Sequence, residues 1–326
     1  MRNLFISIVF LCFVATAVAQ PKLQRRIYLW DVTLSMKGYG GASDIYDEVR
    51  DFLIQDIRYN IRDENTEIVV LPFQEFVLER WIVKADEAGK NDIIRRISSY
   101  NNKDVTSTNI VTPIKEVKES IIRNDRENLF LLLTDGTQSR KFGGRAELDK
   151  EVRTWAEYAR INDATPVYVM LTPEARGDLA ELEPAFKAGG WTLVTDFIIL
   201  RPQNPVTYNI IDDTGQPASV VLTSEGRSGD LPNITIRVHA DENDYITVNQ
   251  EAVVRNGRFS FNVVFKQPES VLRELFPEKT RIPLRLELVN QDEMMRGGSM
   301  VSLNPYRIEL ELINKPEKIL RIYYEE

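Results

Sequence analysis

The chain is poor in cysteine and histidine. Its 326 residues include one cysteine, Cys12, and one histidine, His239. Cys12 stands alone in an apolar stretch near the start, so no disulfide can link two parts of the chain. A chain of this length predicts about two domains, which can bury enough apolar surface without disulfides.

Positive charge is also in the minority. Lys and Arg total 41 against 49 Asp and Glu, which gives a formal net charge of −8. The sequence has no Lys/Arg-rich run, so composition argues against nucleic acid as a partner. Beyond the first residues, no apolar run is long enough to cross a membrane.

Residues 1–19 have the pattern of a signal peptide. Arg2 opens a basic region, residues 4–14 form a short apolar run, and Ala17-Val18-Ala19 resembles a cleavage site. The sequence predicts a mature protein that starts at Gln20, without a thiol or a transmembrane segment. An uncleaved anchor is the alternative. Export without disulfides suits a bacterial protein, so we expect a periplasmic, cell-envelope or secreted location.

Residues 20–201 alternate strand and helix patterns. Continuous apolar runs at 27–30, 68–71, 131–133 and 167–171 are typical of buried parallel strands, and further runs follow at 193–194 and 197–200. Between them, apolar residues recur at helical spacing. This half is therefore predicted to be an α/β domain: a doubly wound, mostly parallel sheet covered on both faces. Residues 77–83 are expected to form an antiparallel edge strand.

The pattern changes near Pro202 and Pro205, which predict a linker. Residues 206–326 show short alternating strands and little helical periodicity. Asn256-Gly257 between two alternating runs predicts a two-residue hairpin turn. We expect this half to be an antiparallel, loosely immunoglobulin-like β-sandwich.

Oxygen-bearing side chains follow two predicted central strands. Asp31, Thr33 and Ser35 come directly after the strand at 27–30, and Asp135 follows the strand that ends near Thr134. Thr108 lies in a polar loop just before a helix. The carboxyl ends of central strands in a doubly wound sheet meet at the switch point, where ligands bind. Carboxylate and hydroxyl oxygens suit a hard divalent cation such as Mg²⁺.

These motifs resemble the von Willebrand factor A domain and its metal-ion-dependent adhesion site. The family motif is Asp-x-Ser-x-Ser, a distant Thr and a distant Asp, matched here by Asp31-x-Thr33-x-Ser35, Thr108 and Asp135. Thr33 replaces the usual serine but keeps its hydroxyl, and Thr106 and Ser107 replace the glycines that commonly precede the Thr. The resemblance covers roughly residues 25–200.

The resemblance implies a site for Mg²⁺, with Mn²⁺ or Ca²⁺ as alternatives, held by Asp31, Thr33, Ser35, Thr108 and Asp135. Ser35 and Thr33 would bind through hydroxyls, Thr108 directly or through water, and the two Asp largely through water. The family's activity is recognition of proteins through a partner's Asp or Glu, so we expect a binding protein and no catalysis.

Two alternatives use the same residues. An exported metal-dependent hydrolase would activate water on the ion, but Ser35 has no evident base, since His239 lies in the other half. A dehalogenase-type phosphatase would need Asp at position 33. A structural envelope component with a vestigial site is the other alternative. The glycine-rich residues 37–43 lack a Gly-Lys-Ser/Thr ending and are predicted to form a flexible rim of the site.

Overall fold

A computed structural model describes residues 23–41, 44–101, 105–135, 138–171, 173–211, 213, 215–225, 233–268, 270–271, 274 and 279–314. The predicted signal peptide, the predicted start at Gln20 and the last twelve residues lie outside this part. Within the described residues, no helix is both long and apolar enough to cross a membrane.

The first half is built around a six-stranded sheet. Its order is β3-β2-β1-β4-β5-β6, and only β3 runs antiparallel to its neighbour. The predicted parallel sheet with an antiparallel edge strand is confirmed. The strands are β1 (Leu23–Asp31), β2 (Glu67–Phe73), β3 (Trp81–Lys84), β4 (Arg126–Thr134), β5 (Ala164–Met170) and β6 (Thr192–Val194).

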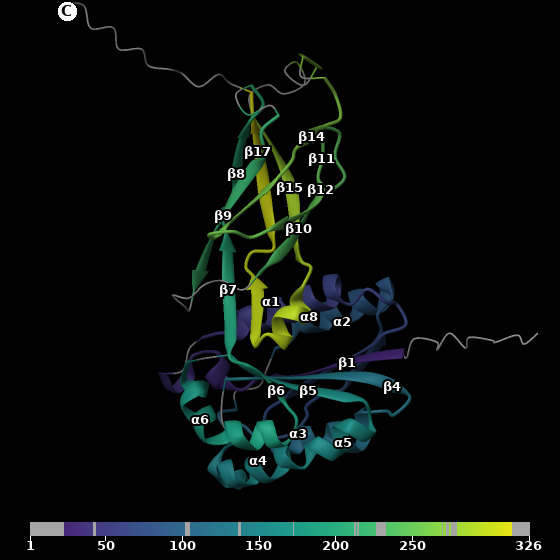
Figure 1. The fold of residues 1–326 in the computed structure, drawn as a ribbon, viewed down its shortest axis with the longest axis vertical. Helices are drawn as coiled ribbons and strands as arrows, with labels where there is room; N and C mark the ends of the chain where they lie inside the picture. Colours follow the sequence, from purple (N-terminus) through teal and green to yellow (C-terminus); the bar gives the residue numbers. More distant parts are fainter. Residues whose placement is uncertain are drawn as a thin grey trace, which may run out of the picture.

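Helices cover both faces of this sheet (Figure 1). In β1, Tyr28 and Trp30 enter one apolar cluster, whereas Ile27 and Leu29 enter the other, because side chains alternate along a strand. One face is covered by α1 (Tyr46–Gln55), with its π-helical end η3 (Asp56–Asn60), and by α2 (Glu87–Ser99). The other is covered by α3 (Val111–Glu116), its π-helical end η4 (Val117–Ile121), α4 (Gly144–Arg153), α5 (Trp155–Ile161) and α6 (Pro173–Ala188).

The second half contains two larger mixed sheets and a two-stranded ribbon. A five-stranded sheet has the order β12-β10-β15-β17-β8, a four-stranded sheet has the order β13-β9-β7-β16, and β11 pairs with β14. The bounds are β7 (Asp196–Pro202), β8 (Val206–Asn209), β9 (Ala218–Glu225), β10 (Thr235–Ala240), β11 (Ile246–Thr247), β12 (Asn249–Val253), β13 (Arg258–Phe261), β14 (Val264–Phe265), β15 (Lys279–Leu288), α8 (Gln291–Arg296), β16 (Ser299–Leu303) and β17 (Arg307–Ile313).

This half differs from the expected antiparallel sandwich. Both larger sheets contribute to one apolar cluster, but β7 pairs parallel with β16 and β8 pairs parallel with β17. An immunoglobulin-like topology is not confirmed. The predicted turn at Asn256-Gly257 is present, with φ of 50° and 68°, although its two flanking strands, β12 and β13, belong to different sheets.

The chain leaves the six-stranded sheet at Val194, ahead of the boundary expected near residue 201. Strand β7 pairs with β16 and β9, so residues 196–202 belong to the second half and Pro202 ends a strand there. The physical reason is that β7 pairs with β16, about a hundred residues later, and its side chains therefore alternate between buried and half-buried from Ile198 onward. Such alternation suits a strand with one covered face, whereas central parallel strands are buried on both.

The two halves share a buried junction. Residues Met295 and Met300 lie in the same apolar cluster as Tyr28 of β1. Gln55 Nε2 donates to the Leu303 carbonyl at 2.7 Å, and Leu303 N donates to Gln55 Oε1 at 3.3 Å. Arg26 binds Asp292 at 3.0 Å across the same junction. The second half therefore packs on the face of the sheet opposite α3–α6 (Figure 1).

Candidate metal centre

The candidate centre lies at the carboxyl ends of β1 and β4. These adjacent parallel strands occupy the middle of the sheet, where the strand order reverses. Asp31 is the last residue of β1 and is fully buried, and Asp135 directly follows β4 and is 7% exposed. Leu34 to Met36 form a short 3-10 turn, η1, which returns the chain past the strand end and brings Thr33 and Ser35 back toward Asp31.

All five residues predicted from sequence meet in one hydrogen-bonded network. Thr33 Oγ1 lies 2.7 Å from Asp31 Oδ1 and 2.9 Å from Ser35 Oγ. Ser35 Oγ donates to Asp135 Oδ1 at 3.0 Å. Thr108 Oγ1 donates to Thr33 Oγ1 at 3.4 Å, although the two residues are 75 positions apart. Three loops thus direct oxygen atoms to one place.

The network holds more oxygen contacts than hydroxyl protons. Its four contacts need four protons, but Thr33, Ser35 and Thr108 supply one each when both carboxylates are ionised. One pair of oxygens then faces each other without a proton. A cation surrounded by these atoms would remove that conflict, because oxygen ligands are attracted to it instead of competing for hydrogen. The donor set therefore fits a hard divalent ion.

Electrostatics support the same interpretation. Burial, followed by repulsion from Asp135, raises the pKa of Asp31 to about 7, although hydrogen bonds from Thr134 and Thr33 favour its ionised form. Two carboxylates at one buried site are costly to ionise together unless a positive charge is shared. Within the described part of the chain, no three His, Cys, Asp or Glu side chains are placed to share a metal ion. Any cation here must use hydroxyls and water as well.

Thr134 is a contributor that the sequence did not reveal. Its Oγ1 donates to Asp31 Oδ2 at 2.6 Å, while Thr33 N donates to Asp31 Oδ1 at 2.9 Å. Both oxygens of Asp31 are therefore oriented by the protein. The only signal in the sequence is a hydroxyl residue immediately before Asp135, at the inward-facing end of β4.

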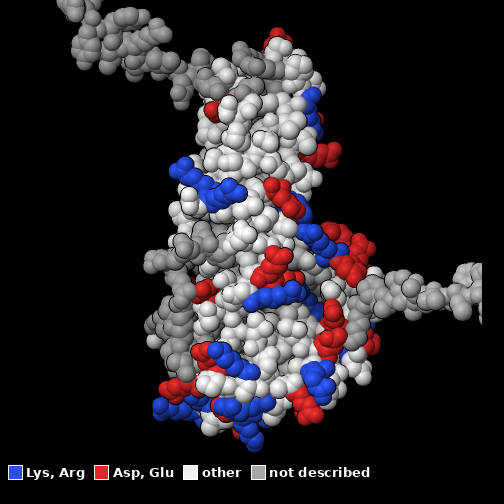
Figure 2. All heavy atoms as spheres, in the orientation of Figure 1, with Lys and Arg blue, Asp and Glu red and all other residues white. Residues whose placement is uncertain are grey.

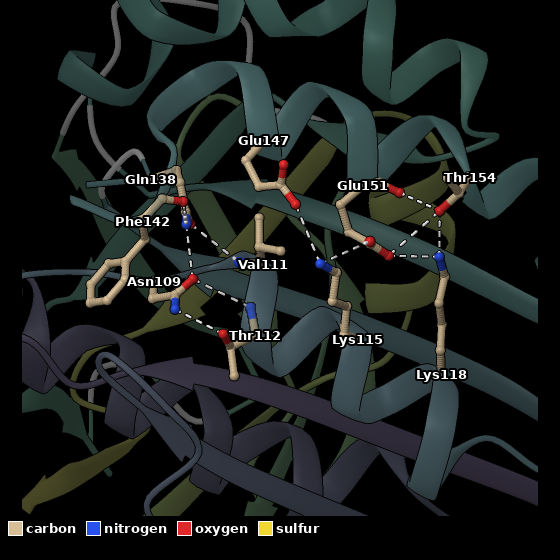
Figure 3. Close-up of polar contacts among 10 residues, drawn as sticks. All are labelled: Asn109, Val111, Thr112, Lys115, Lys118, Gln138, Phe142, Glu147, Glu151 and Thr154. Carbon is tan, nitrogen blue, oxygen red and sulfur yellow. Dashed lines mark hydrogen bonds and ion pairs between the residues drawn. The ribbon is translucent and has the colours of Figure 1, made fainter. Parts of the chain in front are cut away.

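Gln138 and Ser139 join two of the site loops, as Figure 3 shows for Gln138. Gln138 Oε1 accepts from Ile110 N at 2.6 Å and from Val111 N at 3.2 Å, and its Nε2 donates to Asn109 Oδ1 at 2.8 Å. Ser139 Oγ accepts from Thr108 N at 3.0 Å, and Ser139 N donates to the Thr108 carbonyl at 2.9 Å. The segment after Asp135 thereby holds Thr108 and caps α3.

Helix α3 is also braced against α4. Lys118 Nζ binds Glu151 Oε1 at 2.6 Å and Thr154 Oγ1 at 2.5 Å, and Lys115 binds Glu147 at 3.3 Å (Figure 3). The side chains of Lys118 and Glu151 are 15% and 9% exposed, so this pair is better shielded than a typical surface ion pair. The brace extends the fixed unit from the Thr108 loop into α3 and α4.

The rim of the centre carries Glu75, which accepts from Ser107 Oγ at 2.7 Å and pairs with Lys141. These hydrogen bonds, chiefly the one from Lys141, lower the pKa of Glu75. Of the predicted glycine-rich rim, residues 37–41 are described and include a 3-10 turn, η2 (Tyr39–Gly41). His239 lies elsewhere, on the five-stranded sheet, within 3.3 Å of Glu287.

No family model matches the chain. No curated protein matches it either. Among similar solved structures, proximal thread matrix protein 1 from the mussel byssus matches 58% of this chain and 53% of its own, at 14% identity and TM-score 0.36. A structure of that protein with a zinc-occupied MIDAS motif matches 60% and 55%, at 13% identity and TM-score 0.36. This chain thus spans about half the length of the mussel protein.

A von Willebrand factor type A structure from Catenulispora acidiphila matches 91% of this chain and 67% of its own, at 8% identity and TM-score 0.35. Similarities of this size do not establish a family for the chain. The functional argument therefore depends on the residues of the centre.

Proposed function

We propose that this chain is an exported protein that binds a protein partner through a divalent cation. Asp31, Thr33, Ser35, Thr108 and Asp135 would hold Mg²⁺, or Mn²⁺ or Ca²⁺ in its place, and an Asp or Glu of the partner would complete its coordination. The observation that carries the proposal is the convergence of these five side chains in one network with a deficit of one proton.

The proposed role of each residue at the cation follows from the chemistry of its side chain. The hydroxyls of Ser35 and Thr33 are the neutral ligands, and Thr108 approaches from the third loop. Asp31 already accepts hydrogen bonds at both oxygens, so it suits an indirect role through water. A cation with few direct carboxylate ligands keeps more of its charge, and a bound cation therefore attracts a carboxylate from outside.

Binding is favoured over hydrolysis because the one histidine of the sequence, His239, lies on the five-stranded sheet, and the carboxylate in contact with Ser35 is one that the proposal assigns to the ion. That carboxylate is Asp135, which accepts from the Ser35 hydroxyl. We further propose that the first half is a von Willebrand factor A-type domain and that the second half is a β-sandwich that presents it. The basis is the motif order together with the strand order β3-β2-β1-β4-β5-β6.

Surface charge agrees with a protein partner. On the face drawn in Figure 2, Lys and Arg are interspersed with Asp and Glu over the α/β half, without a basic patch. This face lacks the electrostatic footprint of a nucleic-acid-binding surface.

Thermal unfolding with Mg²⁺ and with EDTA tests the metal site. A ligand present at a hundred times its Kd stabilises the native state by about 2.7 kcal/mol, so Mg²⁺ should raise Tm. Asp31→Asn should abolish the shift, whereas Asp125→Asn, at an exposed position before β4, should keep it. Equal curves for the wild type in Mg²⁺ and EDTA would reject the site. A pull-down from envelope extracts in the same two conditions tests the partner.

A further inference from the structure

Two aromatic side chains stand out by their exposure. Tyr39 is 62% exposed and Phe76 is 58% exposed, and every other aromatic residue in the described ranges is buried or half-buried. Both belong to loops at the carboxyl end of the six-stranded sheet. Single aliphatic residues scattered on a surface need no explanation. Here, however, the two exposed aromatic rings of the described residues both lie at the end of the sheet that carries the candidate centre, and this needs an explanation.

Tyr39 follows directly after the loop that carries Thr33 and Ser35. Gly38 N donates to the Ser35 carbonyl at 2.9 Å, which closes the turn after Ser35. Gly38 and Gly40 have φ of 78° and 75°, a conformation that glycine adopts without strain. The chain thus turns sharply on both sides of Tyr39, and the ring lies on the surface at the edge of the centre.

Phe76 lies at the tip of a tight turn after β2. Gln74 N donates to the Phe76 carbonyl at 3.1 Å, and Phe73 pairs with Val77 across the turn. Hydrogen bonds attach this turn to the loop after β1 and to the loop that carries Thr108. Gln74 Nε2 donates to the Val32 carbonyl at 3.0 Å, and Glu75 accepts from Ser107 at 2.7 Å. These hydrogen bonds fix the turn, and the turn keeps the Phe76 ring exposed to solvent.

Exposed cations in the loops around the centre favour an acidic partner. Lys37 and Arg140 are exposed in the loops after β1 and β4. The acid of the turn that carries Phe76, Glu75, pairs with Lys141 and accepts from Ser107, so its charge is balanced within the protein. Aromatic residues and Arg are enriched where protein interfaces gain most of their binding energy.

We infer that Tyr39 and Phe76 form an apolar contact surface beside the cation and that the partner is a protein segment whose acid is flanked by a large apolar side chain. The inference rests on the proposed function, because the acid must reach the ion. Tyr39 and Phe76 then bind the apolar neighbour, and removal of that side chain from water adds affinity and selects among acids.

The test is selection of random peptides displayed on phage, using the full chain in Mg²⁺ and elution with EDTA. We expect the eluted peptides to carry Asp or Glu next to Phe, Tyr, Trp, Leu, Ile or Met. A parallel selection on the double variant Tyr39→Ser, Phe76→Ser should retain the acid and lose the apolar preference. Val264→Ser is the matched control, because Val264 is 60% exposed in the second half.

Affinities of the most enriched peptide complete the experiment. Phe76→Ser and Tyr39→Ser should each weaken binding by about fivefold or more, as expected for central interface residues, and should leave the Mg²⁺-induced rise in Tm unchanged. Eluted peptides with an acid but no apolar neighbour would overturn the inference and leave the proposed function standing. A rise in Tm with no EDTA-eluted peptide would also overturn it. Absence of the rise in Tm would overturn both.

Discussion

The sharpest test of the centre's construction is Gln138→Leu. Gln138 is 4% exposed and makes four hydrogen bonds: it accepts from Ile110 N and Val111 N, and it donates to Asn109 Oδ1 and, at 3.0 Å, to the Phe142 carbonyl. Leucine fills a similar volume but makes none of these bonds.

The expected loss of stability follows from the groups left behind. Ile110 N and Val111 N lie at the start of α3, where no carbonyl of the helix can accept from them. A buried polar group without a partner costs about 1–3 kcal/mol. Asn109 Oδ1 retains a contact with Thr112 N at 3.4 Å, so its loss is smaller. We expect Gln138→Leu to lower the free energy of unfolding by about 2–4 kcal/mol.

The same change should weaken metal binding through Thr108. Once Gln138 no longer holds the start of α3, the Thr108 loop keeps the bonds of its backbone to Ser139 and Gln74, and the Thr108 hydroxyl keeps its contact with Thr33. Calorimetric titration with Mg²⁺ should show lower affinity in Gln138→Leu. In a Thr108→Ala background the substitution should have no further effect on affinity, because it acts through that hydroxyl.

Lys118→Met separates this role from general destabilisation. It breaks the pair between η4 and Glu151 of α4 and should cost about 1 kcal/mol, with unchanged affinity for Mg²⁺. Gln138→Glu is intermediate, since a carboxylate still accepts from the two amides but cannot donate to Asn109. Wild-type Mg²⁺ affinity in Gln138→Leu, together with the expected loss of stability, would refute the reasoning.

Three further outcomes follow from the structure. In EDTA, the raised pKa of Asp31, about 7 in the native state against about 3.9 unfolded, means that the native state binds the proton more tightly. The contribution of Asp31 to the free energy of unfolding is therefore complete below about pH 4 and is lost as pH rises to 7. Urea titrations should give a lower free energy of unfolding at pH 8 than at pH 5, and Asp31→Asn should abolish this difference. Gln55→Ala leaves the buried Leu303 N and carbonyl without their partner and should cost about 2–3 kcal/mol, with the whole chain still unfolding in one transition; two separate transitions in the wild type would contradict a shared junction. Gly257→Ala, at φ of 68°, should lower stability by about 1 kcal/mol, measured by chemical denaturation.

The convergence of the five residues could be predicted in two ways: the two Asp lie at the ends of apolar strands, whereas Thr33, Ser35 and Thr108 were matched through the family motif. Asp31 and Asp135 end apolar strands, and strand ends in a doubly wound sheet converge. Gln138 could not be found in this way. Its role depends on contact with the backbone of residues 110 and 111, which are 28 and 27 positions away, and no local pattern distinguishes it from a surface glutamine.

In the fold, too, features set by neighbouring residues could be predicted, whereas contacts between distant segments could not. The hairpin turn at Asn256-Gly257 is a local feature and was predictable. The assignment of β7 to the second half was not, because an apolar run at 197–200 reads as a strand in either sheet. Partnership with β16, about a hundred residues later, decides its place. The contact of Arg26 with Asp292 joins residues 266 positions apart, and the hydrophobic periodicity of the sequence cannot predict it either.

The proton deficit of the centre and the raised pKa of Asp31 describe one feature. With a proton on Asp31 Oδ1, that carboxyl donates to Thr33 Oγ1, Thr33 donates to Ser35, and Ser35 donates to Asp135, along contacts of 2.7, 2.9 and 3.0 Å. Every contact then has its hydrogen. Burial and Asp135 raise the pKa of Asp31 to about 7, so the ion-free protein retains this proton in mildly acidic solution. A cation and this proton satisfy the same oxygens, and they therefore compete for the centre. Magnesium affinity should accordingly fall as pH drops below 7, by up to tenfold per pH unit, and calorimetry at pH 6 in buffers of different ionisation enthalpy should detect release of up to one proton per ion bound. Affinity independent of pH between 5 and 7 would show that the ion does not replace a proton on Asp31.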